Sequence, residues 1–266
     1  TFNNLKYLKF CIRSIKKNFP HIKMCQWFLD RMDSKWIKNK ARFKEKMDIL
    51  DANFCTTDPI SLKLYNKSVY FIPNPVDSAI DNLKVFNNKF VPNDLFFAMS
   101  HGVHRGILKK GKYDYREVFL RKLINKAPYL KFNFFGFNNN QPIWGEDFKK
   151  QISTTKIALN LSQGKPLKYY SSDRIAQLIG NGILTFVDEK TKLSNFFKKD
   201  ELLTYKDIDD LIKKINIFKK NDKLRIKIAK NGWKRYHKDY NSTIIADFII
   251  SKTMNIKKNF SWEDIN

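Results

Sequence analysis

The segment from Ser100 to Gly106 reads Ser-His-Gly-Val-His-Arg-Gly and has the residue types that hold phosphate. Gly102 and Gly106 allow a backbone to approach a phosphate closely, and Arg105 can donate two hydrogen bonds to its oxygens. We expect a diphosphate site that also includes His104. The alternative is a solvated basic loop in which the histidine is a structural hydrogen-bonding group.

A second candidate lies in residues 169–174, Tyr-Tyr-Ser-Ser-Asp-Arg, which lead into apolar residues at helical spacing. A helix that begins with Ser171 and Ser172 would present unpaired backbone N–H groups and the positive end of the helix dipole. Both favour an anion such as diphosphate. The alternative is ordinary N-capping, because serine is a preferred cap in any protein.

A third candidate follows the predicted strand that ends at Leu161. Here Ser162, Gln163 and Gly164 could contact a sugar or a base, although this segment alone is a weak signal. All three candidates lie just after predicted strands, which is where open parallel sheets bind their ligands.

Metal ligands do not form a recognisable pattern. The pair Asp207 and Asp209 superficially resembles a DxD motif, but it precedes a predicted helix and suits the positive end of the helix dipole. The four histidines and three cysteines lack zinc spacing. We therefore predict no metal and no cofactor.

The elements that must position these residues alternate between strand and helix. Strands are expected at 21–29, 52–56, 69–72, 95–99, 130–135, 156–161 and 183–187, and helices at 5–17, 36–50, 116–125, 147–154 and 172–179, with only helices from 208 onward. Such alternation requires crossover connections, which predict an α/β fold with mostly parallel sheets and helices on both faces.

Four segments are expected along the chain. Residues 1–76 form a partial N-terminal domain, 77–93 a linker, 94–240 a C-terminal domain, and 241–266 a terminal helix and tail. The N-terminal domain is short for a Rossmann-like unit, so we expect its first strands to be absent.

The composition excludes some classes of protein. The chain has 266 residues with 42% hydrophobic and 15% aromatic content, far more apolar area than a disordered chain carries. No apolar run approaches the roughly 18 to 20 residues that cross a bilayer. Cys11, Cys25 and Cys55 are an odd number without CxxC spacing, which favours a reducing cytoplasm.

The net charge of +25 is compatible with nucleic acid, an anionic membrane surface or a phosphorylated substrate. Lys, Asn, Ile and Phe are abundant together, which is typical of AT-rich codons. The basic residues are also scattered over 35–46, 109–112, 213–227 and 252–258 instead of following one face. We therefore expect no nucleic-acid partner, and keep a basic nucleic-acid-binding protein as the alternative.

The segment Arg174–Thr185, RIAQLIGNGILT, resembles the helix and strand RIFEALACGxxLLT of group 1 glycosyltransferases, especially the branch related to spore-maturation proteins. Residues 72–77, IPNPVD, are similar to the IPNGVD with which such enzymes leave their N-terminal domain, and residues 222–236 resemble their closing helices. The resemblance implies a GT-B fold of two Rossmann-like domains, in which the C-terminal domain binds a nucleotide-sugar and the N-terminal domain admits the acceptor.

The same resemblance assigns roles to single residues. It places Ser171, Ser172 and Arg174 on the diphosphate, with Arg105 as a further candidate. The family glutamate that takes the ribose hydroxyls falls on Gln177, which can still accept from one hydroxyl but lacks a charge. The family cysteine falls on Asn181. Ser162 and Gln163 remain candidates for ribose or sugar contact, and no catalytic residue is identified.

The function implied is a metal-independent glycosyltransferase of the hexosyltransferase type. It would move a sugar from a nucleotide diphosphate sugar to a cell-surface polysaccharide, a lipid or a similar acceptor in the biosynthesis of a bacterial cell envelope. We expect a cytoplasmic protein with peripheral contact at the anionic inner face of the membrane. A second alternative is a non-catalytic relative that retains the fold.

Overall fold

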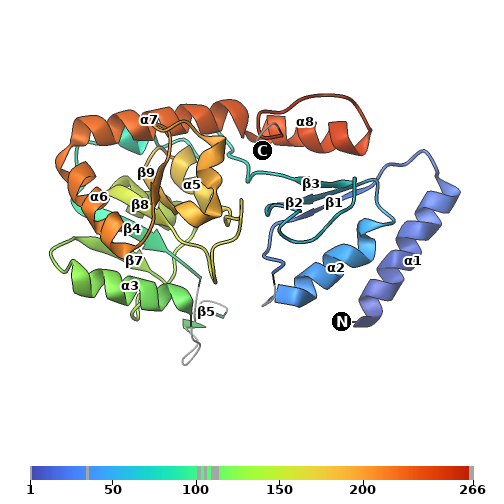
Figure 1. The fold of residues 1–266 in the computed structure, drawn as a ribbon, viewed down its shortest axis with the longest axis horizontal. Helices are drawn as coiled ribbons and strands as arrows, with labels where there is room; N and C mark the ends of the chain where they lie inside the picture. The colour runs from blue at the N-terminus through green and yellow to red at the C-terminus, as the bar shows by residue number, and fades with distance from the viewer. Residues whose placement is uncertain (1, 34–35, 101–102, 105–106, 109–113, 264–266) are drawn as a thin grey trace. The chain divides into compact units, whose positions relative to one another are not determined.

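The computed structural model describes residues 2–33, 36–100, 103–104, 107–108 and 114–263 (Figure 1). The chain divides into two units. Unit 1 comprises Thr1–Pro73, Leu167–Tyr170 and Ser242–Asn266, and unit 2 comprises Asn74–Pro166 and Ser171–Asn241. The C-terminal helix of the chain therefore belongs to the same unit as its N-terminal residues.

Unit 1 is built on a three-stranded parallel sheet in the order β1-β2-β3, with three helices (Figure 1). Its strands are β1 (Cys25–Phe28), β2 (Ala52–Cys55) and β3 (Val69–Phe71), and its helices are α1 (Phe2–Asn18), α2 (Ile37–Met47) and α8 (Ser242–Thr253). The central strand β2 is buried along its whole length, as expected for a parallel strand covered on both faces.

Alternate residues of β2 point to opposite faces of this sheet. Cys55 joins a cluster of buried residues that includes Phe43 of α2. Phe54 packs against Phe248 of α8, with ring centroids 5.6 Å apart, and Phe248 also contacts Trp262 at 5.0 Å. Helices α2 and α8 therefore cover opposite faces of the sheet.

Unit 2 contains a five-stranded parallel sheet in the order β10-β9-β8-β4-β7. These strands are β4 (Asn93–Ala98), β7 (Phe132–Phe135), β8 (Thr155–Asn160), β9 (Leu184–Asp188) and β10 (Leu203–Tyr205). The helices are α3 (Tyr115–Lys126), α4 (Gly145–Ser153), α5 (Arg174–Gly180), α6 (Ile208–Lys220) and α7 (Asp222–Asp239), with short 3-10 helices at Val85–Asn87, Glu189–Thr191 and Leu193–Phe196.

Strand β4 shows how the sheet of unit 2 is covered. Leu95 and Phe97 point into the larger apolar cluster, which α3 and α6 complete, whereas Phe96 and Ala98 point into a second cluster with α4 and α5. The helix starts follow local chemistry: Asp114 caps α3 and Asp207 caps α6 by accepting a backbone N–H hydrogen bond. The helix-dipole interpretation of the Asp207 pair is confirmed.

The predicted alternation of strands and helices is found, with four differences. Strand β10, which has only three residues, was not expected, and neither was the antiparallel pair of β5 (Val103–His104) and β6 (Ile107–Leu108). The helix expected from residue 172 begins at Arg174. Residues 77–93, expected as a linker, lie in unit 2 and bury Val85 and Phe86 there.

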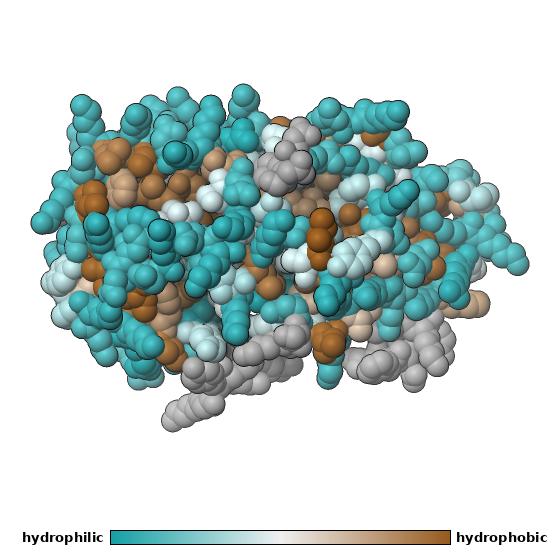
Figure 2. Space-filling view, in the orientation of Figure 1, coloured by the Kyte–Doolittle hydropathy of each residue, from teal (hydrophilic) through white to brown (hydrophobic). Residues whose placement is uncertain are grey.

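Within the described ranges, no helix is both long enough and apolar enough to cross a membrane. Hydrophilic side chains occupy most of the face drawn in Figure 2, with apolar side chains between them. This surface is in keeping with the large excess of lysine and arginine in the sequence.

Candidate functional site

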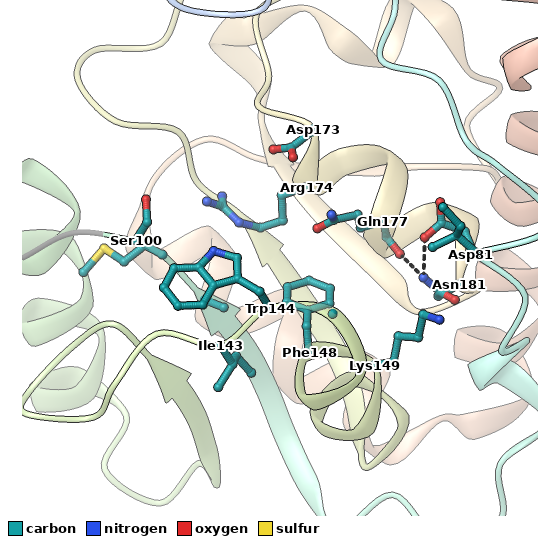
Figure 3. Close-up of a pocket in the computed structure, with 14 residues that line it drawn as sticks. Asp81, Ser100, Ile143, Trp144, Phe148, Lys149, Asp173, Arg174, Gln177 and Asn181 are labelled. Carbon is teal, nitrogen blue, oxygen red and sulfur yellow. Dashed lines mark hydrogen bonds between the residues drawn. The ribbon is translucent and has the colours of Figure 1, made fainter. Parts of the chain in front are cut away.

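Unit 2 contains a pocket of about 230 Å³ at the carboxyl end of its sheet (Figure 3). Four segments line it: the end of β4, the start of α4, one face of α5, and the stretch that precedes β4. The lining residues are Ile80, Asp81, Ala98, Met99, Ser100, Ile143, Trp144, Gly145, Phe148, Lys149, Asp173, Arg174, Gln177 and Asn181. This is the edge of an open parallel sheet at which ligands are expected.

Helix α5 supplies the polar wall of the pocket. Arg174, Gln177 and Asn181 are three and four residues apart, so they lie on one helix face. The helix ends at Gly180, and Asn181 is its C-cap. Gly182 follows with a φ of +77°, which suits glycine, and a Cβ there would lie 2.6 Å from the Phe86 ring. The Asn181–Gly182 pair therefore terminates α5, and Asn181 is the last residue of its polar face.

The Arg174 side chain is only 9% exposed, yet it lines the pocket. One guanidinium nitrogen donates to the backbone oxygen of Leu161 at 3.1 Å, and the guanidinium carbon lies 5.0 Å from the centroid of the Phe97 ring. These contacts hold the planar group in one orientation. A fixed guanidinium beside a pocket is well suited to bind an anion such as phosphate.

Helix α4 supplies the apolar wall and one cation. Trp144 precedes the helix, lines the pocket and is 59% exposed, so one face of its ring is available to a planar ligand (Figure 3). Phe148 lies one turn further along, buried against Phe96 at 5.2 Å. Lys149 pairs with Glu146 at 2.8 Å and extends the pocket wall.

Asp81 brings a buried carboxylate to the pocket, and no motif in the sequence pointed to it. Asn181 Nδ2 donates to Asp81 Oδ1 and to the backbone oxygen of Gln177, both at 2.8 Å. Burial raises the pKa of the Asp81 carboxyl, although the backbone N–H of Asp77, the Asn181 amide and the charges of His237 and Lys149 oppose that shift. Asn181, which stands where the family cysteine would, thus anchors this carboxylate.

The two predicted serines occupy different environments from those expected. Ser171 is 2% exposed, and its hydroxyl accepts from Asn160 at 2.8 Å and donates to the Ser172 backbone oxygen at 2.8 Å. Ser172 Oγ is buried and has no hydrogen-bond partner among the described residues. The expectation that these serines begin the helix was wrong, because Ser171 is held by Asn160 and regular helix starts two residues later.

The other predicted residues divide between described and undescribed parts of the chain. His104 is the second residue of β5, paired with Ile107 of β6. Gly102, Arg105 and Gly106 lie outside the described residues. Ser162 and Gln163 are half-buried in the loop after β8 and do not line the pocket, so their contact with a sugar or ribose stays a prediction. The diphosphate roles likewise stay predictions.

No group of three or more His, Cys, Asp or Glu side chains in the described part of the chain is arranged to hold a metal ion. The pocket instead offers an aromatic ring, neutral amides, a buried carboxylate and a guanidinium. This set can bind a ligand that has a planar ring, hydroxyl groups and an anionic end.

The sequence matches a family model described as glycosyl transferase-like over residues 116–251, slightly more than half of the chain. The matched region includes α4 and α5, which form two of the pocket walls. A search of curated proteins finds no match.

Several solved structures share the fold at low sequence identity. HepE of Anabaena in complex with UDP-glucose has a TM-score of 0.61 at 9% identity, over 94% of this chain and 77% of HepE. A variant of S. aureus TarM in complex with fondaparinux, alpha-GlcNAc-glycerol and UDP has a TM-score of 0.60 at 14% identity, over 87% and 50% of the two chains. Sucrose-phosphate synthase of Thermosynechococcus elongatus has 0.57 at 11%, over 87% and 67%. The predicted α/β fold of the GT-B type is confirmed.

Proposed function

The chain belongs to the glycosyl transferase-like family, and on that premise we propose that it transfers a sugar from a nucleotide diphosphate sugar to an acceptor hydroxyl. In this reaction the bond between the anomeric carbon and the diphosphate oxygen breaks, and a bond to the acceptor oxygen forms. The acceptor proton is released, and the nucleoside diphosphate leaves as an anion whose developing charge must be stabilised.

The single observation that carries this proposal is the pocket of unit 2. Its chemistry matches the parts of a nucleoside diphosphate: Trp144 offers a ring face for the base, Gln177 an amide for the ribose, and Arg174 a guanidinium for the phosphates. Gln177 and Arg174 are one turn apart on α5, so ribose and phosphate groups would lie along the same helix. A buried guanidinium stabilises an anion more strongly than an exposed one.

The finer features of the proposal rest on the family and on the neighbouring structures. The HepE complex contains UDP-glucose and the TarM complex contains UDP, which supports a uridine nucleotide as the first donor to test. The TarM complex also contains fondaparinux and alpha-GlcNAc-glycerol, which supports a glycan acceptor. We propose a hexosyl donor, a cell-surface polysaccharide or lipid acceptor, and phosphate stabilisation by Arg174 without a divalent metal. The Arg174–Thr185 segment supports a place in the spore-maturation branch.

Calorimetric titration with UDP, GDP, ADP and CDP, with and without Mg²⁺, tests donor binding. We expect saturable binding of one nucleotide without the metal, weakened by about tenfold or more in Arg174→Gln, since a hydrogen bond to a charged group contributes about 1.5 to 3 kcal/mol. Arg225→Gln is the matched control, because Arg225 is also buried in unit 2 but does not line the pocket. Equal losses in the two variants would contradict a phosphate role for Arg174.

An oligonucleotide titration separates the alternatives. Salt-sensitive binding of single-stranded DNA or RNA without nucleotide binding would favour a nucleic-acid-binding protein, for which the net charge of +25 is the supporting observation. Nucleotide binding without hydrolysis or transfer of any tested sugar would favour a non-catalytic relative.

We also propose that the protein is cytoplasmic and contacts the membrane peripherally. Exposed side chains of helix α1 support this contact. Phe10 is 71% exposed on this helix, and Arg13 and Lys17 are exposed beside it. Basic side chains near an anionic bilayer contribute about 1 kcal/mol each. We expect sedimentation with phosphatidylserine vesicles at low salt that Arg13→Gln/Lys17→Gln weakens and the control Lys223→Gln/Lys227→Gln in α7 does not. Absence of vesicle binding at low salt would reject this contact.

A further inference from the structure

The carboxylate of Asp81 has more hydrogen-bonding capacity than its surroundings use. Its Oδ1 accepts from Asn181 at 2.8 Å, and the contact of Oδ2 with the backbone N–H of Asp77 is long, at 3.4 Å. No ion pair joins Asp81 to a cation within the described residues. A carboxylate has about four acceptor positions, so most of this capacity is unfilled although the residue is only 7% exposed.

A buried carboxylate in this state is costly for the folded protein. Burial raises its pKa, because desolvation disfavours the charged form more than the nearby Asn181 amide, His237 and Lys149 favour it. Proteins generally satisfy buried polar groups, and an exception needs an explanation. Because Asp81 lines the pocket, a ligand with hydroxyl groups can supply the missing donors.

Gln177 lies on the pocket wall beside this carboxylate. Its side-chain amide makes no hydrogen bond among the described residues and points into the pocket, and its backbone oxygen shares the Asn181 Nδ2 donor with Asp81 (Figure 3). Gln177 can donate and accept, whereas ionised Asp81 can only accept. Together they offer one strong and one weak acceptor to a pair of neighbouring hydroxyl groups.

We propose that Asp81, with Gln177 beside it, binds the ribose hydroxyls of the nucleotide and makes this pocket selective for ribonucleotides. The proposal rests on the nucleotide-binding function proposed above. Asn181 is the positioning residue, because it fixes the carboxylate against α5 at 2.8 Å. The negative charge of the ribose subsite therefore comes from the segment before β4 and not from α5.

The test compares UDP with 2′,3′-dideoxy-UDP by calorimetry on the full chain. Asp81→Asn keeps the shape of the side chain and an acceptor for Asn181 but loses the charge. We expect this substitution to weaken the binding of UDP by about tenfold and the binding of the dideoxy analogue by less than twofold, because charge-assisted hydrogen bonds are roughly twice as strong as neutral ones. In Asp81→Asn/Gln177→Glu the charge moves to α5, and we expect UDP affinity to return to within about threefold of the wild type.

The outcomes separate this inference from the function on which it rests. If no nucleoside diphosphate binds the wild type, the proposed function is wrong and the inference with it. If UDP binds and Asp81→Asn weakens both nucleotides equally, or neither, only the inference is overturned. A second measurement needs no variant: the preference of the wild type for UDP over the dideoxy analogue should fall as Asp81 is protonated at lower pH. A preference independent of pH between 4 and 8 would overturn the inference.

Discussion

The two units of this chain have the same kind of sheet but differ in how completely it is covered. The five strands of unit 2 are packed on both faces by clusters that include Phe97 and Phe96 on alternate sides of β4. In unit 1 only the central strand is fully buried, and Cys25 and Trp27 of β1 are exposed. Most exposed large apolar side chains of the described residues also belong to unit 1.

This difference bears on function because every lining residue of the pocket belongs to unit 2. A binding site needs side chains held in fixed orientations, and a sheet packed on both faces provides that rigidity. In unit 1 only the central strand is fully buried, and this unit has more of the exposed large apolar side chains. We therefore expect the two units to respond differently to the same perturbation.

The largest effect is expected from truncation of a buried phenylalanine in each unit. Phe248→Ala in unit 1 and Phe186→Ala in unit 2 each remove a side chain no more than 1% exposed. Each should lower the free energy of unfolding of its own unit by about 3 to 5 kcal/mol. By scanning calorimetry and UDP titration, Phe248→Ala should lose stability but keep nucleotide affinity within about threefold, whereas Phe186→Ala should lose both. Loss of UDP binding in folded Phe248→Ala would contradict the separation of the units.

A second perturbation tests the backbone beside the pocket. Gly136 has a φ of +69°, and a Cβ there would lie 1.7 Å from the backbone oxygen of Met99, which lines the pocket. Gly136→Ala should lower the free energy of unfolding by more than about 2 kcal/mol, because the cost of the strained backbone adds to the cost of the clash with the main chain. Gly145→Ala is the control, since Gly145 has a φ of +55° with nothing within 4 Å of the added Cβ. It should cost about 1 kcal/mol in urea unfolding. Equal costs would mean that the loop after β7 moves freely.

The fold was predictable because its signal is local and repeated. Apolar runs such as 95–99 and helical spacing such as that of residues 116–125 occur in alternation, and the corresponding β4 and α3 are found within a few residues of the predicted bounds. Strand β10 spans only Leu203–Tyr205, which is too short to show an alternating pattern, and it is defined by its pairing with β9, which lies earlier in the chain. Such pairing leaves no periodic pattern in the sequence.

The site was predictable only where a motif covers it. The α5 segment pointed to Arg174 and Gln177, and both line the pocket. Asp81 was missed because its contact is Asn181, 100 residues away, and neither residue has a pattern around it. The start of α5 was misplaced for the same reason, since Ser171 contacts Asn160, which ends a different element. Contacts between distant segments are the information that local sequence analysis lacks.

The aromatic wall of the pocket gives a prediction about affinity instead of stability. Trp144→Ala should weaken the binding of UDP by about tenfold, because the stacking of a base on an aromatic ring contributes about 1 to 3 kcal/mol. Unfolding should change little, since the side chain is 59% exposed. Phe90→Ala is the matched control, because Phe90 is an aromatic residue of unit 2 with 77% exposure that does not line the pocket. Equal UDP affinities in the two variants would place the base elsewhere.

Two carboxylates give opposite pH dependences in the two units. Burial raises the pKa of Asp81, against the opposing effects of Asp77 N–H, Asn181, His237 and Lys149. The folded state then holds this proton more tightly than the unfolded chain, so unfolding free energy falls as pH rises from about 4 through the raised pKa. Asp81→Asn should therefore be more stable than the wild type at pH 7 and no more stable below pH 4, as measured by urea unfolding.

Asp51 in unit 1 is the control for Asp81, because its pKa is shifted in the opposite direction. Burial acts to raise its pKa, but hydrogen bonds from Lys16 and the Met24 N–H and the charges of Lys16 and Lys23 outweigh it and lower the pKa. Its stabilisation is present above about pH 4 and lost as pH falls through the lowered value. Asp51→Asn should therefore destabilise the protein at pH 7. A loss of stability in Asp81→Asn at pH 7 would contradict the inference that the buried Asp81 carboxylate lacks hydrogen-bond donors.

The smallest effect is a difference in thiol reactivity that reports on unit 1 alone. Burial raises the pKa of Cys55 to about 12, and its Sγ lies 3.2 Å from the backbone oxygen of Thr57, whereas Cys11 and Cys25 are exposed. Because the thiolate is the reactive form, a disulfide reagent at pH 8 should label Cys11 and Cys25 quickly and Cys55 only when unit 1 opens. Phe248→Ala should therefore accelerate labelling of Cys55, while a destabilising change in unit 2 such as G136A should leave it slow. Labelling of Cys55 at an equal rate in both variants would show that the units open together.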